Sequence, residues 1–308
     1  MTADSGQIPY ELINGPVADP YQPRVAETYS DATHLWQDVI GPGLWFQFGV
    51  YGQDDMPAPQ DESPESLDAS GRRHLERQLD IAGLNDHGRE PERILDVGFG
   101  WGTALEHLAR RFPHCPRLDG VNISLTQTEY AARRTAALSL AGRVKLYLCN
   151  AQDLWLLPDP EQPYDLVLMR GSITHFSAGL LDAALRALAS RMSGGGTLVI
   201  SESLYNIPLQ DYTSALPDDE DRLACGHRKT LNLLADALMR NSFMLQDARR
   251  LPTDEDVIHW LQDVRANIER VFPREIPKAF RELRDTAVNL TAALHEGTYS
   301  VYSIIASR

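Results

Sequence analysis

The chain has 308 residues, 43% of them hydrophobic, and a formal net charge of −14. That length can bury the core of one large domain with an appendage, and no apolar stretch is long enough to predict a membrane span. Residues 1–70 carry −11 of the charge, and an acidic surface repels phosphate backbones, so neither DNA nor RNA is expected as a substrate. Met1–Tyr10 lacks the basic and apolar regions of a signal peptide, and the three cysteines have no metal-ligand spacing. We therefore expect a cytoplasmic protein without a metal site.

The N-terminal segment is predicted to be an arm that precedes the main domain. Residues 1–25 are rich in Pro, Asp and Gly and should be extended, and Val25–Val39 should be a helix that ends at Gly41-Pro42-Gly43. Gln53–Asp68 is acidic and Pro-rich, which predicts a mobile loop, and a helix is expected over Glu65–Gly83.

Aromatic residues crowd the middle of this arm, at Trp45, Phe46, Phe48 and Tyr51. One interpretation is a strand or buttress that fills the core. The other is an aromatic lid over a cationic centre, because ring faces stabilise positive charge. The sequence leaves both open.

From Glu92 onward, strand and helix patterns alternate. The expected strands are 93–97, 117–121, 144–148, 166–169 and 197–201, followed by 243–251 and 299–306. The expected helices are 103–112, 126–140, 178–191, 227–240, 254–272 and 275–296. This alternation predicts a Rossmann-like α/β fold, with a seven-stranded, mostly parallel sheet and helices on both faces. We divide the chain into 1–70, an N-terminal helical arm with the aromatic lid, and 71–308, the main domain, with a helical cap inserted at about 203–242 and 252–296.

A glycine-rich turn follows the first strand of that domain. Asp96-Val97-Gly98-Phe99-Gly100-Trp101-Gly102 has three glycines at alternate positions, and Thr103 stands where a dinucleotide-binding turn has its third glycine. Glycines let the backbone approach a ligand closely, and Asp96 can balance a cationic group. S-adenosylmethionine, a ligand with positive charge and no phosphate, therefore fits this turn better than NAD.

Polar side chains follow the later strands. The second strand is followed by residues that can bond ribose hydroxyls without bringing charge, namely Asn122, Ser124 and Gln127. After the third strand, the amide of Asn150 or Gln152 can bond a purine edge. After the fourth, His175 is a candidate general base. Each has a structural alternative: Ser124 can cap a helix, Asn150 can form a turn, and His175 can be a packed residue.

Residues 93–203 resemble class I S-adenosylmethionine-dependent methyltransferases. The resemblance lies in the glycine turn, in Tyr164-Asp165-Leu166-Val167 and in Gly194-Gly195-Gly196-Thr197-Leu198. Gly120-Val121-Asn122-Ile123-Ser124-Leu125-Thr126-Gln127 is similar to the G-x-T-x-S-x-x-Q of one branch of that class. That branch holds cyclopropane fatty acid synthases, sterol and terpenoid C-methyltransferases, and natural-product N- and O-methyltransferases. Tyr29-x-x-x-Thr33 and Phe46-Gln47-Phe48-Gly49 are similar to its Y-x-x-x-T and F-H-F-[GA].

The resemblance implies roles for these residues. S-adenosylmethionine would be held by Tyr29, Phe46, Asp96, Gly98, Gly100, Gly102, Asn122, Ser124, Gln127, Asn150, Ala151, Gln152 and Arg170. We expect the acceptor site to be lined by Trp45, Phe48, Tyr51, Gly171, Tyr205 and His227. The prenyl C-methyltransferases and cyclopropane synthases carry a glutamate where this chain has Gly171. His175, Glu202, Tyr10 or a cap residue such as His227 would then act as the base, unless the acceptor is an amine that loses its proton readily.

We therefore expect a methyltransferase that methylates carbon or nitrogen of a small-molecule, secondary-metabolite acceptor and leaves S-adenosylhomocysteine as product. In-line transfer from a sulfonium needs mainly positioning and the exclusion of water, which a lid and a cap would supply. The alternatives are an O-methyltransferase of the same fold, a methyltransferase-fold cyclase, a nicotinamide-dependent oxidoreductase and a non-catalytic binder of the donor. The arm is also a candidate for exchange between subunits of a homo-oligomer.

Overall fold

The computed structural model describes residues 10–52, 63, 66–84, 90–217 and 221–308. Its strands are β1 (Glu11–Ile13), β2 (Arg93–Val97), β3 (Arg117–Asn122), β4 (Val144–Cys149), β5 (Tyr164–Arg170), β6 (Met192–Tyr205), β7 (Met244–Arg250) and β8 (Tyr299–Ser307). Its α-helices are α1 (Gln22–Thr28), α2 (Thr33–Ile40), α3 (Leu67–Ile81), α4 (Thr103–Arg111), α5 (Leu125–Ala137), α6 (Ala178–Arg191), α7 (Leu231–Arg240), α8 (Asp254–Val271) and α9 (Lys278–His295). Its 3-10 helices are η1 (Ala151–Leu156), η2 (Ile173–His175), η3 (Leu209–Asp211) and η4 (Arg222–Ala224).

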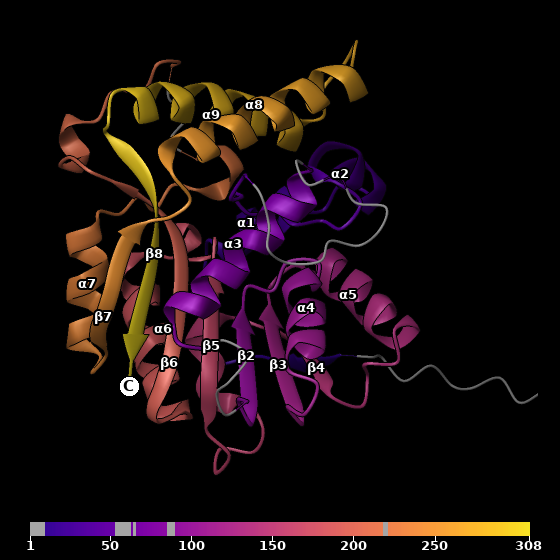
Figure 1. The fold of residues 1–308 in the computed structure, drawn as a ribbon, viewed down its shortest axis with the longest axis vertical. Coiled ribbons are helices and arrows are strands. Elements are labelled where there is room, and N and C mark those ends of the chain that lie inside the picture. Colours follow the sequence, from indigo (N-terminus) through magenta and orange to yellow (C-terminus); the bar gives the residue numbers. More distant parts are fainter. Residues whose placement is uncertain (1–9, 53–62, 64–65, 85–89, 218–220) are drawn as a thin grey trace, which may run out of the picture.

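The strands form one eight-stranded sheet in the order β1-β4-β3-β2-β5-β6-β8-β7 (Figure 1). Strands β1 to β6 are all parallel to one another, and β8 runs antiparallel to both β6 and β7. The parallel strands therefore end at one edge of the sheet, where open α/β folds place their ligands. The mostly parallel Rossmann-like fold expected from the alternating pattern is confirmed.

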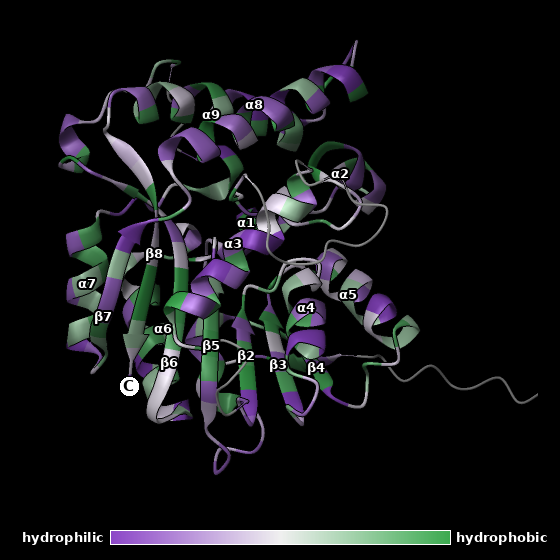
Figure 2. Cartoon of the chain, viewed as in Figure 1, coloured by the Kyte–Doolittle hydropathy of each residue, from purple (hydrophilic) through white to green (hydrophobic). Residues whose placement is uncertain are grey.

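Helices cover both faces of the sheet because successive strand residues point to opposite sides. On β2, Ile94 packs in a cluster with residues of α3, α4 and α5, while the next residue, Leu95, packs with residues of η1, α6 and α7. Figure 2 shows the hydrophobic residues concentrated along the central strands. Helix α7 belongs to this sheet-covering layer, since Leu234 and Leu238 pack in the same cluster as Leu95.

A separate apolar cluster lies above the carboxyl edge of the sheet. It joins α2, α8 and α9, with Trp36 and Phe280 at its centre, their rings 4.7 Å apart. Figure 1 shows α8 and α9, which we call the cap, crossing above the strand ends. Helix α8 begins with a capping box in which Thr253 and Asp256 each accept a backbone N–H of the other. The cap thus closes the edge where the ligand site is expected.

The structure differs from the sequence-based expectation in the arm. The sheet has eight strands instead of seven, because Glu11–Ile13 pairs with β4 inside a segment expected to be only extended. The helix expected over residues 25–39 is two helices, α1 and α2, separated at Tyr29–Ala32. The loop expected over residues 53–68 lies largely outside the described residues. Among the residues that the structure describes, no helix is both long and apolar enough to cross a bilayer.

Candidate active site

Two cavities lie side by side at the carboxyl edge of the sheet. The first, of about 1100 Å³, is bordered by the ends of β2, β3, β4 and β5 and by the arm. The second, of about 1160 Å³, is bordered by the end of β6, by η4 and by the cap. The residues that border both cavities are Tyr29, Phe46, Gln47, Gly171 and His175.

The glycine turn forms one wall of the first cavity, and its three glycines serve different purposes. All have positive φ, at +84° for Gly98, +56° for Gly100 and +84° for Gly102. A Cβ on Gly98 would lie 2.7 Å from the Cβ of Ser172, and one on Gly102 would lie 2.9 Å from the Cβ of Ala131. A Cβ on Gly100 would meet nothing within 4 Å. Gly98 and Gly102 thus permit close packing, and Gly100 leaves room in the cavity. Gly98 and Gly100 line the cavity, whereas Gly102, expected to hold the donor, does not.

The buried carboxyl group of Asp96 and the partly buried guanidinium of Arg170 border this cavity without full pairing. Asp96 is 3% exposed and its Oδ2 has no hydrogen-bond partner. Burial raises the pKa of Asp96 to about 7, although the nearby Arg170 guanidinium opposes the shift. Arg170 donates from Nε to Gln78 at 3.0 Å, its Nη2 has no partner, and burial lowers its pKa to about 10. Buried groups of this kind signal a binding site for a polar ligand.

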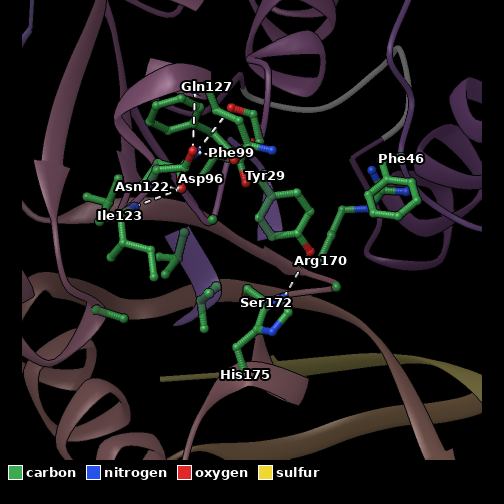
Figure 3. A pocket seen from close by; sticks show the side chains of 18 of the residues that line it. Tyr29, Phe46, Asp96, Phe99, Asn122, Ile123, Gln127, Arg170, Ser172 and His175 are labelled. Atoms are coloured by element: carbon green, nitrogen blue, oxygen red, sulfur yellow. Dashed lines mark hydrogen bonds between the residues drawn. The ribbon is translucent and has the colours of Figure 1, made fainter. Parts of the chain in front are cut away.

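The polar residues after β3 form a network around the turn. The Asn122 side-chain amide donates to the carbonyl of Gly100 at 3.1 Å and to Gln127 Oε1 at 3.0 Å (Figure 3). Its oxygen accepts the backbone N–H of Ile123 at 2.7 Å. Ser124 caps α5 by accepting the N–H of Gln127 at 3.4 Å, so the structural role anticipated for it is present. The three hydrogen bonds of Asn122 rigidify the cavity wall, whereas the Ser124 bond stabilises the first turn of α5.

The arm closes the far end of the first cavity. The Asn150 side-chain amide donates to Gln22 Oε1 at 2.9 Å and to Asp19 Oδ2 at 3.3 Å. Asn150 and Ala151 line the cavity, whereas Gln152 does not and instead donates to the carbonyl of Val17 at 2.6 Å. The segment before α1 is therefore held against the loop that follows β4.

His175 and Tyr29 meet at the wall between the cavities. His175 Nδ1 lies 2.8 Å from the carbonyl oxygen of Ala224, and Nε2 lies 3.2 Å from the Tyr29 hydroxyl (Figure 3). A carbonyl can only accept, so Nδ1 carries the proton and Nε2 accepts from Tyr29. Burial lowers the pKa of His175 to about 4 and raises that of Tyr29. The imidazole is therefore neutral at physiological pH, with its basic nitrogen at the boundary.

The second cavity is lined mainly by rings and aliphatic side chains. Its aromatic lining consists of Tyr29, Phe46, Phe48, Tyr205, Tyr212, Trp260 and Tyr299. Glu202, at the end of β6, is 2% exposed and accepts the backbone N–H groups of Thr174 at 3.1 Å and Ser203 at 2.9 Å. Burial raises the pKa of Glu202. The cavity thus combines apolar walls with one buried carboxyl group next to η2.

The structure separates the expected site residues into those at the cavities and those elsewhere. Tyr10 packs against the helices on the α3 face of the sheet, and Tyr51 stacks on His259 of α8 with ring centres 4.0 Å apart. His227 contacts Tyr21 edge-on and borders neither cavity. Trp45, expected at the acceptor, lines the first cavity. Trp45 and Phe48 line different cavities because neighbouring residues of an extended segment point in different directions.

Sequence reasoning missed several residues of the cavity walls. Gln47 borders both cavities and donates to Ser201 Oγ at 2.8 Å, and Trp260 of α8 lines the second cavity. Gln47 occupies the histidine position of the F-H-F-[GA] motif, and this position could have identified it as a residue of the site. Trp260 carried none, because a tryptophan on an amphipathic helix is indistinguishable from a core residue.

Comparisons with known proteins agree with this geometry. Residues 94–196 match the family model described as "Methyltransferase domain". An ajmaline N-methyltransferase from Rauvolfia serpentina is 27% identical over 65% of this chain and 64% of its own length. The chain thus spans just under two thirds of that relative.

Solved structures share the whole fold. A cyclopropane synthase from Mycobacterium tuberculosis has a TM-score of 0.74 at 11% identity, covering 96% of this chain and 100% of its own. A geranyl diphosphate C-methyltransferase from Streptomyces coelicolor A3(2) has a TM-score of 0.69 at 17% identity, covering 94% and 99%. Residues 94–196 are therefore a methyltransferase domain, and the chain as a whole has the class I S-adenosylmethionine-dependent methyltransferase fold.

Proposed function

We propose that the protein transfers a methyl group from S-adenosylmethionine to carbon or nitrogen of a small-molecule acceptor. One observation carries this proposal: two cavities meet at a single wall, and that wall holds Gly171 and His175. The first cavity would hold the donor and the second the acceptor. We refer to them as the donor cavity and the acceptor cavity.

The residues of the donor cavity fit S-adenosylmethionine. Its methionine end carries an ammonium and a carboxylate, which match the unpartnered atoms of Asp96 and Arg170. The space above Gly100 would receive this end. The ribose hydroxyls would meet the polar network of Asn122 and Gln127, in which Ser124 caps the adjoining helix. The adenine would lie beside Ala151 and Asn150.

The bound donor supplies a methyl carbon activated by a sulfonium. The protein's part is to orient the acceptor, to exclude water and to accept a proton where the acceptor loses one. Tyr29 and Phe46 would close over the boundary, and His175 Nε2 is the basic atom placed there. Glu202 accepts the backbone N–H of Thr174, the residue before His175, and borders the acceptor cavity, so it is the second candidate for the proton.

The lining of the acceptor cavity supports an acceptor with a large apolar or aromatic body. Rings from the arm, β6, α8 and β8 surround it, and such rings also stabilise a cationic centre. The ajmaline N-methyltransferase, a relative that acts on a natural product, supports a secondary-metabolite acceptor. The geranyl diphosphate C-methyltransferase, whose structure holds S-adenosyl-L-homocysteine, supports the assignment of the donor.

A matched pair of glycine variants tests the proposal. Gly100 and Gly83 both have positive φ and open space at Cβ, but only Gly100 lies in the donor cavity. Each Ala variant pays the same backbone cost of about 1–2 kcal/mol. We expect Gly100→Ala alone to weaken S-adenosylmethionine binding in calorimetry, by about tenfold or more, and Gly83→Ala to bind as the wild type does. Equal binding by both variants would contradict the assignment of the cavity.

The reaction itself is tested with methyl-labelled donor and a panel of amine, phenol and prenylated acceptors. Label in a heavier product, together with S-adenosylhomocysteine, supports methyl transfer. A product of unchanged mass would identify a cyclase, and binding without turnover over a broad panel would identify a non-catalytic binder. The division of the chain at residue 70, a cytoplasmic location and a homo-oligomer formed through the arm remain predictions.

A further inference from the structure

The backbone of η4 has a conformation that its residues disfavour. Leu223 has φ +52° and ψ +26°, and Ala224 has φ +54°. Both lie in the left-handed region, which L-residues with a side chain rarely enter and which glycine enters at no steric cost. Two consecutive residues of this kind persist only where surrounding contacts hold them.

One side chain of the cap supplies such a contact. Glu282 of α9 accepts the backbone N–H of Leu223 on Oε2 at 2.7 Å, and its side chain is only 11% exposed. The Leu223 side chain is buried in the apolar cluster of the cap. The turn is thus fixed from α9 by a hydrogen bond to a charged group, the stronger kind of hydrogen bond.

The turn directs the Ala224 carbonyl at His175. That carbonyl accepts the Nδ1–H of His175 at 2.8 Å and so selects the tautomer whose Nε2 is unprotonated. Outside this turn, Nδ1 has no other hydrogen-bond partner among the described residues. If the turn relaxed, the imidazole would be free to carry its proton on either nitrogen.

We propose that Glu282 is a positioning residue for His175: by holding the left-handed turn at Leu223 and Ala224, it fixes the tautomer that leaves Nε2 basic at the cavity boundary. The catalytic meaning of this arrangement rests on the proposed function, whereas the arrangement itself does not.

The carboxylate of Glu282 also pairs with a residue of the arm. Arg24 of α1 donates from Nη2 to Glu282 at 3.0 Å and from Nε to Asp221 Oδ2 at 2.8 Å. Helix α1 contributes Val25 to the donor cavity. The contacts that close the arm over the donor cavity and those that orient His175 therefore converge on Glu282.

The tautomer of His175 is measured by nitrogen-15 NMR on histidine-labelled full-length protein, with its resonances assigned by His175→Gln. We expect the wild type to show only the Nδ1–H form, and Glu282→Ala to show both forms. Once an acceptor of the wild type is identified, Glu282→Ala should also have a kcat about tenfold lower than that of the wild type. This loss is a fraction of what a general base contributes. Glu282→Gln, which keeps an oxygen for the Leu223 N–H, should retain the Nδ1–H form.

Two further variants make the test specific. Adding Ala224→Gly to Glu282→Ala should restore part of the Nδ1–H form, because glycine removes the strain at one of the two left-handed positions. Glu269→Ala removes an exposed glutamate of α8 that pairs with Arg265 and should change nothing. If Glu282→Ala does not fold, Glu282→Met replaces it, since it keeps the side-chain volume.

A single Nδ1–H form in Glu282→Ala or Glu282→Met would overturn the proposal, as would an equal disturbance by Glu269→Ala. The NMR measurement needs neither donor nor acceptor. Failure of the wild type to transfer methyl would therefore refute the proposed function while leaving this inference to be judged by the spectra.

Discussion

The buried carboxyl of Asp96 predicts that donor affinity depends on pH. Burial raises its pKa to about 7, so below that pH the free protein holds this group protonated. The ammonium of the donor needs the carboxylate, so binding must release the proton. Affinity should therefore rise with pH up to about 7 and level off above it.

The magnitude follows from the size of the shift. If the bound ammonium returns the pKa of Asp96 to its ordinary value of about 4, affinity falls about tenfold for each pH unit below 7. Between pH 7.5 and pH 5.5 the dissociation constant should then rise about 25-fold, or about 2 kcal/mol. Asp96→Asn removes the titrating group and should bind weakly, with a dissociation constant that is nearly flat over this range.

Calorimetry with S-adenosylhomocysteine measures this without turnover. Titrations at each pH in two buffers of different ionisation enthalpy also count the protons released, which should approach one at pH 5.5. The variant still contains Arg170, His175 and Glu202, so the difference between the two proteins isolates Asp96. The reasoning is refuted if the wild type and Asp96→Asn show the same pH slope.

Three further predictions concern other parts of the molecule. Arg24→Met removes the ion pairs that tie α1 to η4 and α9 and should weaken donor binding by about 1 kcal/mol, or about fivefold, in calorimetry. Arg93→Met removes one of the two guanidinium groups that pair with the buried carboxylate of Asp119, 2.7 Å away. Arg117 and the Tyr164 hydroxyl remain as partners, so the loss should be about 1.5–3 kcal/mol in urea unfolding. The pKa of His175 is about 4 in the folded protein, below its unfolded value. The unfolded chain therefore binds the proton more readily, and the folded protein loses stability as the pH falls through 6.5. Relative to His175→Gln, the wild type should lose about 2 kcal/mol of unfolding free energy between pH 7 and pH 5.

Local pattern was sufficient to place the glycine turn. An apolar strand, three glycines and an amphipathic helix are contiguous, and each feature depends on its immediate neighbours. The turn between Asp96 and Gly102 accordingly lies where it was expected, at the carboxyl edge of the sheet. The sequence pattern could not show that the three glycines have different roles. Only the positions of Ser172 and Ala131 reveal that Gly98 and Gly102 pack closely against neighbouring side chains, whereas Gly100 has open space in the cavity.

The acceptor cavity was harder to predict because it is built from distant segments. Phe46 from the arm, Glu202 from β6 and Trp260 from α8 become neighbours through packing alone. A single sequence contains no signal for such contacts. The three-residue strand β1 was missed for a related reason: Glu11–Ile13 is too short to show a period, and its pairing with β4 decides its conformation.

The low pKa of His175 fits a reaction with a cationic donor. With the donor bound as proposed, a protonated imidazole at the boundary would repel the sulfonium, because like charges repel strongly in a buried, low-dielectric environment. Burial instead keeps the ring neutral, and the Ala224 carbonyl sets which nitrogen is basic. A weak base suffices where the proton leaves after or during methylation, because the methylated product is then the stronger acid. A carbon acceptor satisfies that condition, because methylation leaves a carbocation that is a much stronger acid than imidazolium. The ammonium left by an amine acceptor is a weaker acid than imidazolium, so it would release its proton to solvent and need no protein base.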